Sequence, residues 1–155
     1  MSESSIVKAI AMAPYKKLFF TFLLIVSIIV GGSFYLMKLG LYIRHSLEKT
    51  GKTQNIIVFV IVLSSIIYSS YITKQKVKLH ALENFEEKKS FHKTYYRTRK
   101  IWVAGNCFAL CISFLIVANW LFIYFSLAEM LVFLIYFPNE RFFRKELKGD
   151  EIVFI

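Results

Sequence analysis

One stretch of the chain, residues 101–137, is thirty-seven residues long and contains a single charged side chain, Glu129. A straight helix of that length would measure about 55 Å, whereas the hydrocarbon core of a bilayer is about 30 Å thick. The stretch is therefore expected to cross a membrane twice. We expect the turn at Asn119 and Trp120, because asparagine tolerates the left-handed conformation that ends helices and tryptophan favours the membrane–water interface.

Two further apolar segments, residues 18–37 and 56–72, are each long enough to cross a bilayer as a helix. Hydrophobic residues make up 57% of the 155-residue chain, which is more than a soluble domain of this size carries. The sequence thus predicts an all-α fold: one integral membrane four-helix bundle, built of two transmembrane helical hairpins. The predicted spans are residues 18–37, 56–72, 101–118 and 121–137.

The net charge of +10 is concentrated outside these spans. Residues 73–100 form a basic segment in which we expect the second and third spans to continue as helices, with a turn near residues 88–91. If the N-terminus, this segment and the tail at 138–155 share one side, sixteen of the twenty basic residues lie there. The positive-inside rule then predicts that both termini are cytoplasmic, as in a bacterial inner membrane protein.

The basic segment is expected to contact anionic lipid or an acidic partner, because cations next to a membrane are attracted to its anionic leaflet. Nucleic acid is a poor alternative, since no recognition module accompanies the charge. The nine basic residues are Lys74, Lys76, Lys78, Lys88, Lys89, Lys93, Arg97, Arg99 and Lys100.

The two ends of the chain are less constrained by the sequence. Residues 6–13 fit either a short interfacial helix that Pro14 ends or a disordered tail. In the C-terminal tail, basic and acidic residues balance, and the apolar side chains fit contact with headgroups or a partner. These apolar residues are Phe142, Phe143, Leu147 and Ile152.

Glu129 is the strongest candidate for a functional side chain, because a charge inside the membrane costs roughly 2.5–3.5 kcal/mol on insertion scales. It is either a proton carrier or a protonated carboxyl that fixes helix packing through a hydrogen bond. We expect Asn106 to form a hydrogen bond between helices. We expect Ser64 and Ser65 to bond either to a backbone carbonyl one turn earlier or to a neighbouring helix; alternatively they line a polar path.

The sequence offers no catalytic or cofactor-binding motif, and no cofactor is expected. Cys107 and Cys111 share one helical face, but no histidine lies near enough in sequence to complete a metal site, so buried thiols are expected. We therefore expect a non-enzymatic accessory or scaffold subunit, present as a homo-oligomer or within a membrane complex. The alternative is a transporter or proton-conducting subunit that uses Glu129.

The order of landmarks from Tyr96 to Glu146 resembles a family of small uncharacterised bacterial four-span membrane proteins. The resemblance implies a four-span fold, and its landmarks are Ala104, Gly105, Phe108, Asn119, Leu121, Phe122, Pro138, Glu146 and Leu147. Two hairpins with a carboxyl in the fourth span are also similar in outline to the proteolipid rotor subunits of proton-translocating ATPases. The present chain lacks the glycine-rich first and third spans of those subunits.

Overall fold

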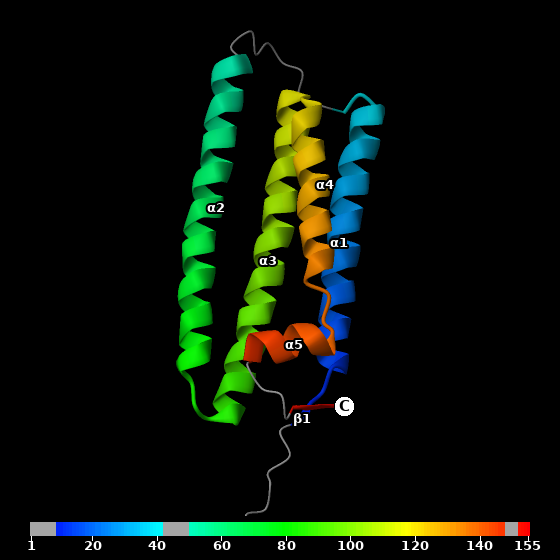
Figure 1. Ribbon diagram of the computed structural model, residues 1–155. Helices are drawn as coiled ribbons and strands as arrows, with labels where there is room; N and C mark the ends of the chain where they lie inside the picture. The colour runs from blue at the N-terminus through cyan, green and yellow to red at the C-terminus, as the bar shows by residue number, and fades with distance from the viewer. Residues whose placement is uncertain (1–8, 42–49, 148–151) are drawn as a thin grey trace, which may run out of the picture.

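The computed structural model describes residues 9–41, 50–147 and 152–155. In these residues the chain forms five helices and one short two-stranded sheet (Figure 1). The elements are β1 (Ala9–Ile10), α1 (Ala13–Lys38), α2 (Thr50–Ala81), α3 (Phe85–Val117), α4 (Trp120–Ile135), α5 (Glu140–Leu147) and β2 (Val153–Phe154).

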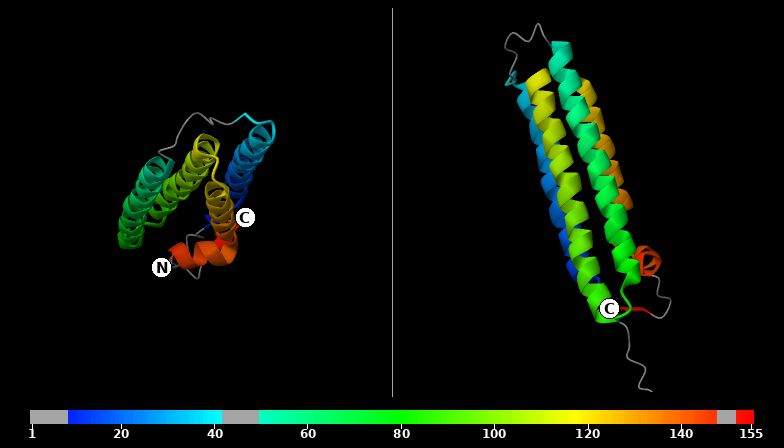
Figure 2. Two further views of the ribbon diagram at one scale, coloured as in Figure 1. Left: turned by 90° about the horizontal axis from the view of Figure 1, so that it is seen from above. Right: turned by 90° about the vertical axis from the view of Figure 1, so that its left-hand side faces the viewer.

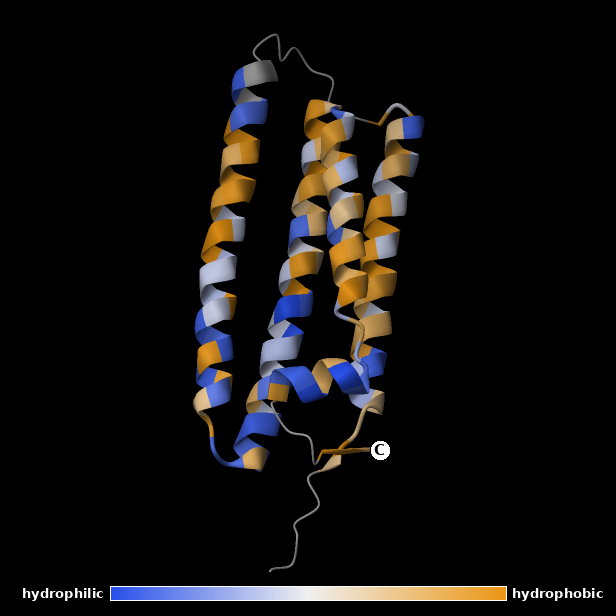
Figure 3. Cartoon of the chain, in the orientation of Figure 1, coloured by the Kyte–Doolittle hydropathy of each residue, from blue (hydrophilic) through white to orange (hydrophobic). Residues whose placement is uncertain are grey.

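The helices α1, α2 and α3 are each long and apolar enough to cross a membrane, and α4 with α5 forms a further candidate that is bent by 82°. The sequence predicts four spans, and the described residues hold three to four candidates, which is consistent with an integral membrane protein. Hydrophobic residues dominate the middle of the bundle, and hydrophilic residues gather towards the lower ends of α2 and α3 (Figure 3). This lower end, which also holds both ends of the chain, is called the basic end below.

The packing of the long helices differs from two separate hairpins. The helix α3 packs against α1, α2 and α4, and it lies between α1 and α2 (Figure 2). The predicted hairpin of the last two spans is present as α3 and α4, but α1 and α2 do not pack as a hairpin. The two-residue link between α3 and α4 forces those helices together, whereas residues 39–49 are long enough to reach past α3.

Two helix boundaries also differ from the predictions. The helix α1 begins at Ala13, so Pro14 lies in its first turn, where a missing N–H breaks no helical hydrogen bond. Pro14 therefore starts a helix rather than ending one, and the remainder of the suggested interfacial helix, residues 6–8, lies outside the described residues. The turn between α2 and α3 falls at residues 82–84 rather than 88–91, because the Asn84 side chain caps α3 by accepting a hydrogen bond from the Glu86 N–H at 2.9 Å.

The tail at 138–155 folds against the bundle. The helix α5 lies across the basic end (Figure 1) and buries Phe143 and Leu147. The strand β2 then pairs in parallel with β1, and the Met12 N–H donates to the Ile155 carbonyl at 2.9 Å. The fold is thus helical apart from this small sheet, which joins the two ends of the chain.

The buried side chains form two clusters. The larger one lies between the apolar parts of α1, α3 and α4 and includes Phe19, Phe114 and Phe133. The second lies at the basic end, where α5 and the sheet cover the bundle, and it includes Tyr96 and Phe143. The second cluster explains why α5 and β2 pack on the bundle: their apolar residues complete a core at the basic end.

Candidate functional site: a groove beside Glu129 and a buried ionic cluster

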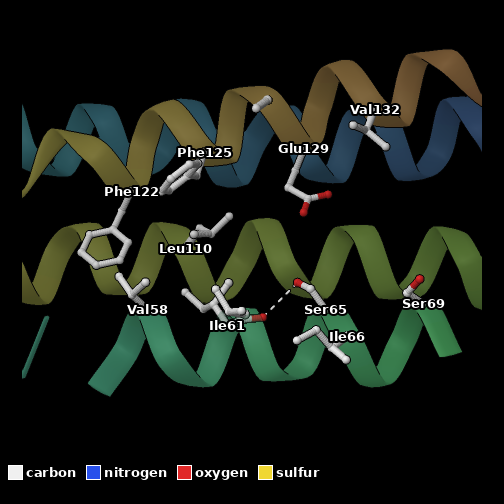
Figure 4. Close-up of a pocket in the computed structure, with 12 residues that line it drawn as sticks. Val58, Ile61, Ser65, Ile66, Ser69, Leu110, Phe122, Phe125, Glu129 and Val132 are labelled. Atoms are coloured by element: carbon white, nitrogen blue, oxygen red, sulfur yellow. Dashed lines mark hydrogen bonds between the residues drawn. The ribbon is translucent and has the colours of Figure 1, made fainter. Parts of the chain in front are cut away.

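A groove of about 470 Å³ runs between α2 and α4 over the surface of α3 (Figure 4). It exists because α2 packs closely only against α3. Nine of its twelve lining side chains are apolar, and those at its rim, such as Ile66 and Phe125, are 58% and 48% exposed. Since the rim lies within the apolar part of the bundle, the groove opens on the apolar outer surface of the bundle.

Glu129 projects from α4 into this groove and is half-buried (Figure 4). The side-chain amide of Asn106, on α3, lies close enough to interact with its carboxyl. Among the residues that the structure describes, no basic side chain forms an ion pair with Glu129. Asn106 thus lies beside Glu129, its hydrogen bond between helices stays a prediction, and Glu129 has no counter-ion in the described part of the chain.

The serines of α2 bond to their own helix. The hydroxyls of Ser64 and Ser65 donate to the carbonyl of Ile61 at 2.8 and 2.9 Å, as one of the two predictions for them proposed. The polar side chains that line the groove are Ser65, Ser69 and Glu129. They form a small polar patch in an apolar wall rather than a continuous path along it.

The predicted turn at Asn119 and Trp120 is confirmed, with one change. Ala118 adopts the left-handed conformation, with φ of 54°, whereas Asn119 is extended. The Asn119 side chain accepts a hydrogen bond from the Leu121 N–H at 2.9 Å and so caps α4. The Trp120 ring packs near Phe34 and Phe114, which fixes the tip of the hairpin against α1 and α3.

The nine basic residues predicted to contact lipid or a partner fall into three groups. The exposed ones are Lys74, Lys76, Lys78, Lys93 and Arg97, and Lys88 and Lys89 are half-buried. Arg99 and Lys100 are only 7% and 1% exposed. The prediction is therefore wrong for Arg99 and Lys100, whose side chains turn into the protein because α5 and surrounding aromatic rings cover them.

Arg99 belongs to a buried ionic cluster with Glu146 of α5 and His92. The Arg99 guanidinium donates to one Glu146 oxygen and lies 3.9 Å from the centre of the Tyr136 ring. The His92 Nε2 lies 2.8 Å from the other oxygen of the same carboxylate. Burial raises the pKa of Glu146, but the hydrogen bond from His92 and the charge of Arg99 outweigh it and hold the pKa below its ordinary value.

Lys100 holds the end of α4. Its Nζ donates to the carbonyls of Phe133 and Tyr136 at 3.3 and 3.2 Å, where α4 has no further intrahelical donors. The same ammonium lies 3.9 Å from the centre of the Phe133 ring and 4.5 Å from that of Phe19. A cation at a helix C-terminus is favourable, so Lys100 stabilises the point where the chain turns from α4 towards α5.

The histidines and cysteines take part in packing. The His80 Nε2 lies 3.0 Å from the backbone carbonyl of Glu146, so two histidines meet α5. Cys107 and Cys111 are buried, as predicted, and their sulfur atoms lie 3.7 Å from the Ser126 carbonyl and 3.4 Å from its hydroxyl. In the described part of the chain, no three His, Cys, Asp or Glu side chains are grouped to hold a metal ion.

Sequence reasoning missed the roles of His92 and Glu146. Both lie in polar segments, where a charge usually faces water. A signal was present in the aromatic residues around them, since Tyr95, Tyr96 and Phe143 are too many aromatic rings for a solvated surface.

No protein-family model, curated protein or solved structure matches the chain significantly. The resemblance of residues 96–146 to small four-span proteins stays a prediction.

Proposed function

We propose that the protein is a non-enzymatic accessory or scaffold subunit of a membrane complex. The groove beside Glu129 is the observation that carries the proposal. Its apolar wall suits the side chains of another transmembrane helix, and Glu129 offers that helix a hydrogen bond inside the membrane. A carboxyl without hydrogen-bond partners is costly within a membrane. A partner helix that donates a hydrogen bond to Glu129 would therefore bind to this groove in preference to other apolar surfaces.

The proposed location is a bacterial inner membrane with both termini and the basic end in the cytoplasm. The distribution of Lys and Arg supports this orientation, because most basic residues lie at the end that also holds β1 and β2. The exposed lysines of α2 would then face the anionic leaflet and place the groove at a fixed depth.

Proton transport through Glu129 is the second candidate. It is supported by a carboxyl that borders an open groove and that forms no ion pair with any cation in the described ranges. The arrangement favours it less than a scaffold, since Ser64 and Ser65 donate to the Ile61 carbonyl and nine of the twelve side chains that line the groove are apolar.

A pair of substitutions separates the two functions. Glu129→Gln keeps the shape and the hydrogen bond but cannot carry a proton, whereas Glu129→Leu removes both. For a scaffold, the Gln variant should keep the co-purifying subunit or the oligomer, and the Leu variant should lose it. A Gln variant that assembles normally but has lost proton flux in reconstituted vesicles would instead establish transport.

A photo-crosslinking amino acid at Ile66, on the rim of the groove, tests the site directly. The matched control is Ile28, which is 64% exposed on α1 but does not line the groove. In cells, the Ile66 position should give an adduct of one defined polypeptide mass, which Glu129→Leu abolishes, and Ile28 should give lipid adducts. Lipid adducts alone at both positions, with a monomeric purified protein, would rule out the scaffold.

A further inference from the structure

A second groove, of about 300 Å³, lies on the bundle between α1 and α3 near the basic end. On α1 it is lined by Tyr15, Leu18 and Phe22, and on α3 by Lys93, Arg97 and Ile101. Leu18 and Ile101 are the residues at which the sequence predicts the first and third spans to begin. The groove therefore passes through the level at which the protein enters the membrane.

The two walls of this groove change from polar to apolar in the same direction. The helices α1 and α3 both run away from the basic end (Figure 1), so residues later in each helix lie deeper in the membrane. The side chains of Lys93, Arg97 and Ile101 are spaced by four residues and form one stripe along α3. The groove is thus cationic outside the membrane and apolar within it.

The two cations of the groove are accessible from outside the chain. Lys93 and Arg97 are both exposed, and in the described ranges neither side chain forms an ion pair. Arg99, two residues further along, is instead buried against Glu146. Lys93 and Arg97 are therefore able to bind an anion from outside the chain.

A smaller cavity of about 280 Å³ continues this groove away from the membrane. It shares Pro14, Tyr15 and Lys93 with the groove. It adds three polar residues of α3, Ser90, Lys89 and Glu86, and two apolar residues, Ile10 and Ala11. Lys89 and Glu86 lie 3.6 Å apart as a surface ion pair. Polar side chains of α3 thus line one side of the space beyond Lys93, whereas apolar residues near the start of α1 line the other side, and the space beyond Arg97 is apolar.

We propose that the groove between α1 and α3 binds one anionic phospholipid. Lys93 and Arg97 hold its phosphate, an acyl chain lies along Leu18, Phe22 and Ile101, and the polar headgroup extends towards Ser90. Along the groove the cations come first and the apolar surface lies deeper, in the same order as the phosphate and the acyl chains of such a lipid. The proposal rests on the proposed membrane orientation, and it names a ligand for a surface distinct from the Glu129 groove.

The experiment uses the full-length protein purified from its membrane, with bound phosphatidylglycerol counted by native mass spectrometry and its affinity titrated in mixed micelles. A double variant, Lys93→Gln with Arg97→Gln, is compared with Lys74→Gln with Lys76→Gln, which removes two exposed lysines of α2 outside the groove. The groove variant should lower the affinity about 25-fold, since each such cation contributes about 1 kcal/mol near an anionic leaflet. The α2 variant should change it less than twofold.

A third variant tests the apolar part without changing charge. Ile101 is 49% exposed, so Ile101→Trp adds bulk to the groove with little effect on the core. It should also weaken phosphatidylglycerol binding, and excess glycerol phosphate should not displace the lipid. Equal affinity in the two charge variants would overturn the proposal. So would full retention in Ile101→Trp, or preferential binding of an acidic peptide.

The two proposals fail separately. Glu129→Leu should leave phosphatidylglycerol binding unchanged, because Glu129 lies in the other groove. A protein that loses its lipid in the Lys93 and Arg97 variant but keeps its partner confirms the lipid site independently of the scaffold.

Discussion

At the scale of residues, neighbouring cations near the membrane have opposite environments. Lys93 and Arg97 face outwards along one stripe of α3, whereas Arg99 and Lys100 face the aromatic core at the basic end. Because a helix places successive side chains on different faces, the two pairs of cations lie on different sides of α3. The two buried cations interact with different groups. Arg99 pairs with a carboxylate, and Lys100 binds the free carbonyls at the end of α4.

Removing the Glu146 charge should destabilise the protein strongly. Glu146→Gln leaves Arg99 buried without a counter-ion, and breaking a buried pair in this way costs about 3 kcal/mol. Glu140→Gln, on an exposed face of the same helix, is the matched control and should change the free energy of unfolding by less than about 0.5 kcal/mol. Reversible unfolding in mixed micelles measures both. Equal effects of the two substitutions would contradict the structural role of the cluster.

The same carboxyl predicts a dependence of stability on pH. The folded-state pKa of Glu146 lies below its ordinary value of 4.5, so the folded protein binds its proton less tightly than the unfolded chain does. The stabilisation is complete above that ordinary value and is lost as the pH falls through the folded-state pKa. The difference in unfolding free energy between wild type and Glu146→Gln should therefore shrink in acid, and a constant difference would refute the assignment.

At the scale of elements, the hairpin of α3 and α4 is the part of the fold that the sequence predicts best. A long apolar run with asparagine and tryptophan near its middle determines both the number of crossings and the position of the turn. The conformation of the turn was not predictable in detail. Ala118 rather than Asn119 takes the left-handed conformation, because the asparagine side chain is needed as the cap of α4.

Ala118→Gly should stabilise the hairpin. Alanine is strained at φ of 54°, and glycine adopts that conformation freely, so a gain of about 0.5–1 kcal/mol is expected. The control is Ala109→Gly, at an exposed position within α3, where glycine should instead cost about 1 kcal/mol. Unfolding in mixed micelles should give opposite signs for the two variants. A loss of stability in Ala118→Gly would show that the turn differs from the structure.

The ends of the chain and the pairing of the first two spans were beyond sequence reasoning. The paired residues of β1 and β2 are more than 140 positions apart in the sequence, and two-residue strands are too short to show a periodic hydrophobic pattern. Apolar periodicity shows that a helix crosses a membrane but not which neighbour it packs against. The position of α2 on the far side of α3 depends on side-chain packing along whole helices.

At the scale of the whole molecule, the described residues form three structurally distinct parts. The helices α1, α3 and α4 form a tight apolar core, and α2 packs closely only on α3, which leaves the Glu129 groove open. The helix α5 and the sheet seal the basic end around the ionic cluster. Both proposed binding surfaces, one for a helix and one for a lipid, depend on the same placement of four helices across a bilayer.

That placement is tested most directly by labelling single cysteines with a membrane-impermeant thiol reagent in sealed, oriented vesicles. The native Cys107 and Cys111 are 0% and 1% exposed, so the new cysteines alone should react. Glu83→Cys and Glu140→Cys should be labelled from one face, and Leu41→Cys and Asn119→Cys from the other. Labelling of Glu83→Cys and Glu140→Cys from opposite faces, or an Asn119→Cys shielded from both, would contradict the four crossings.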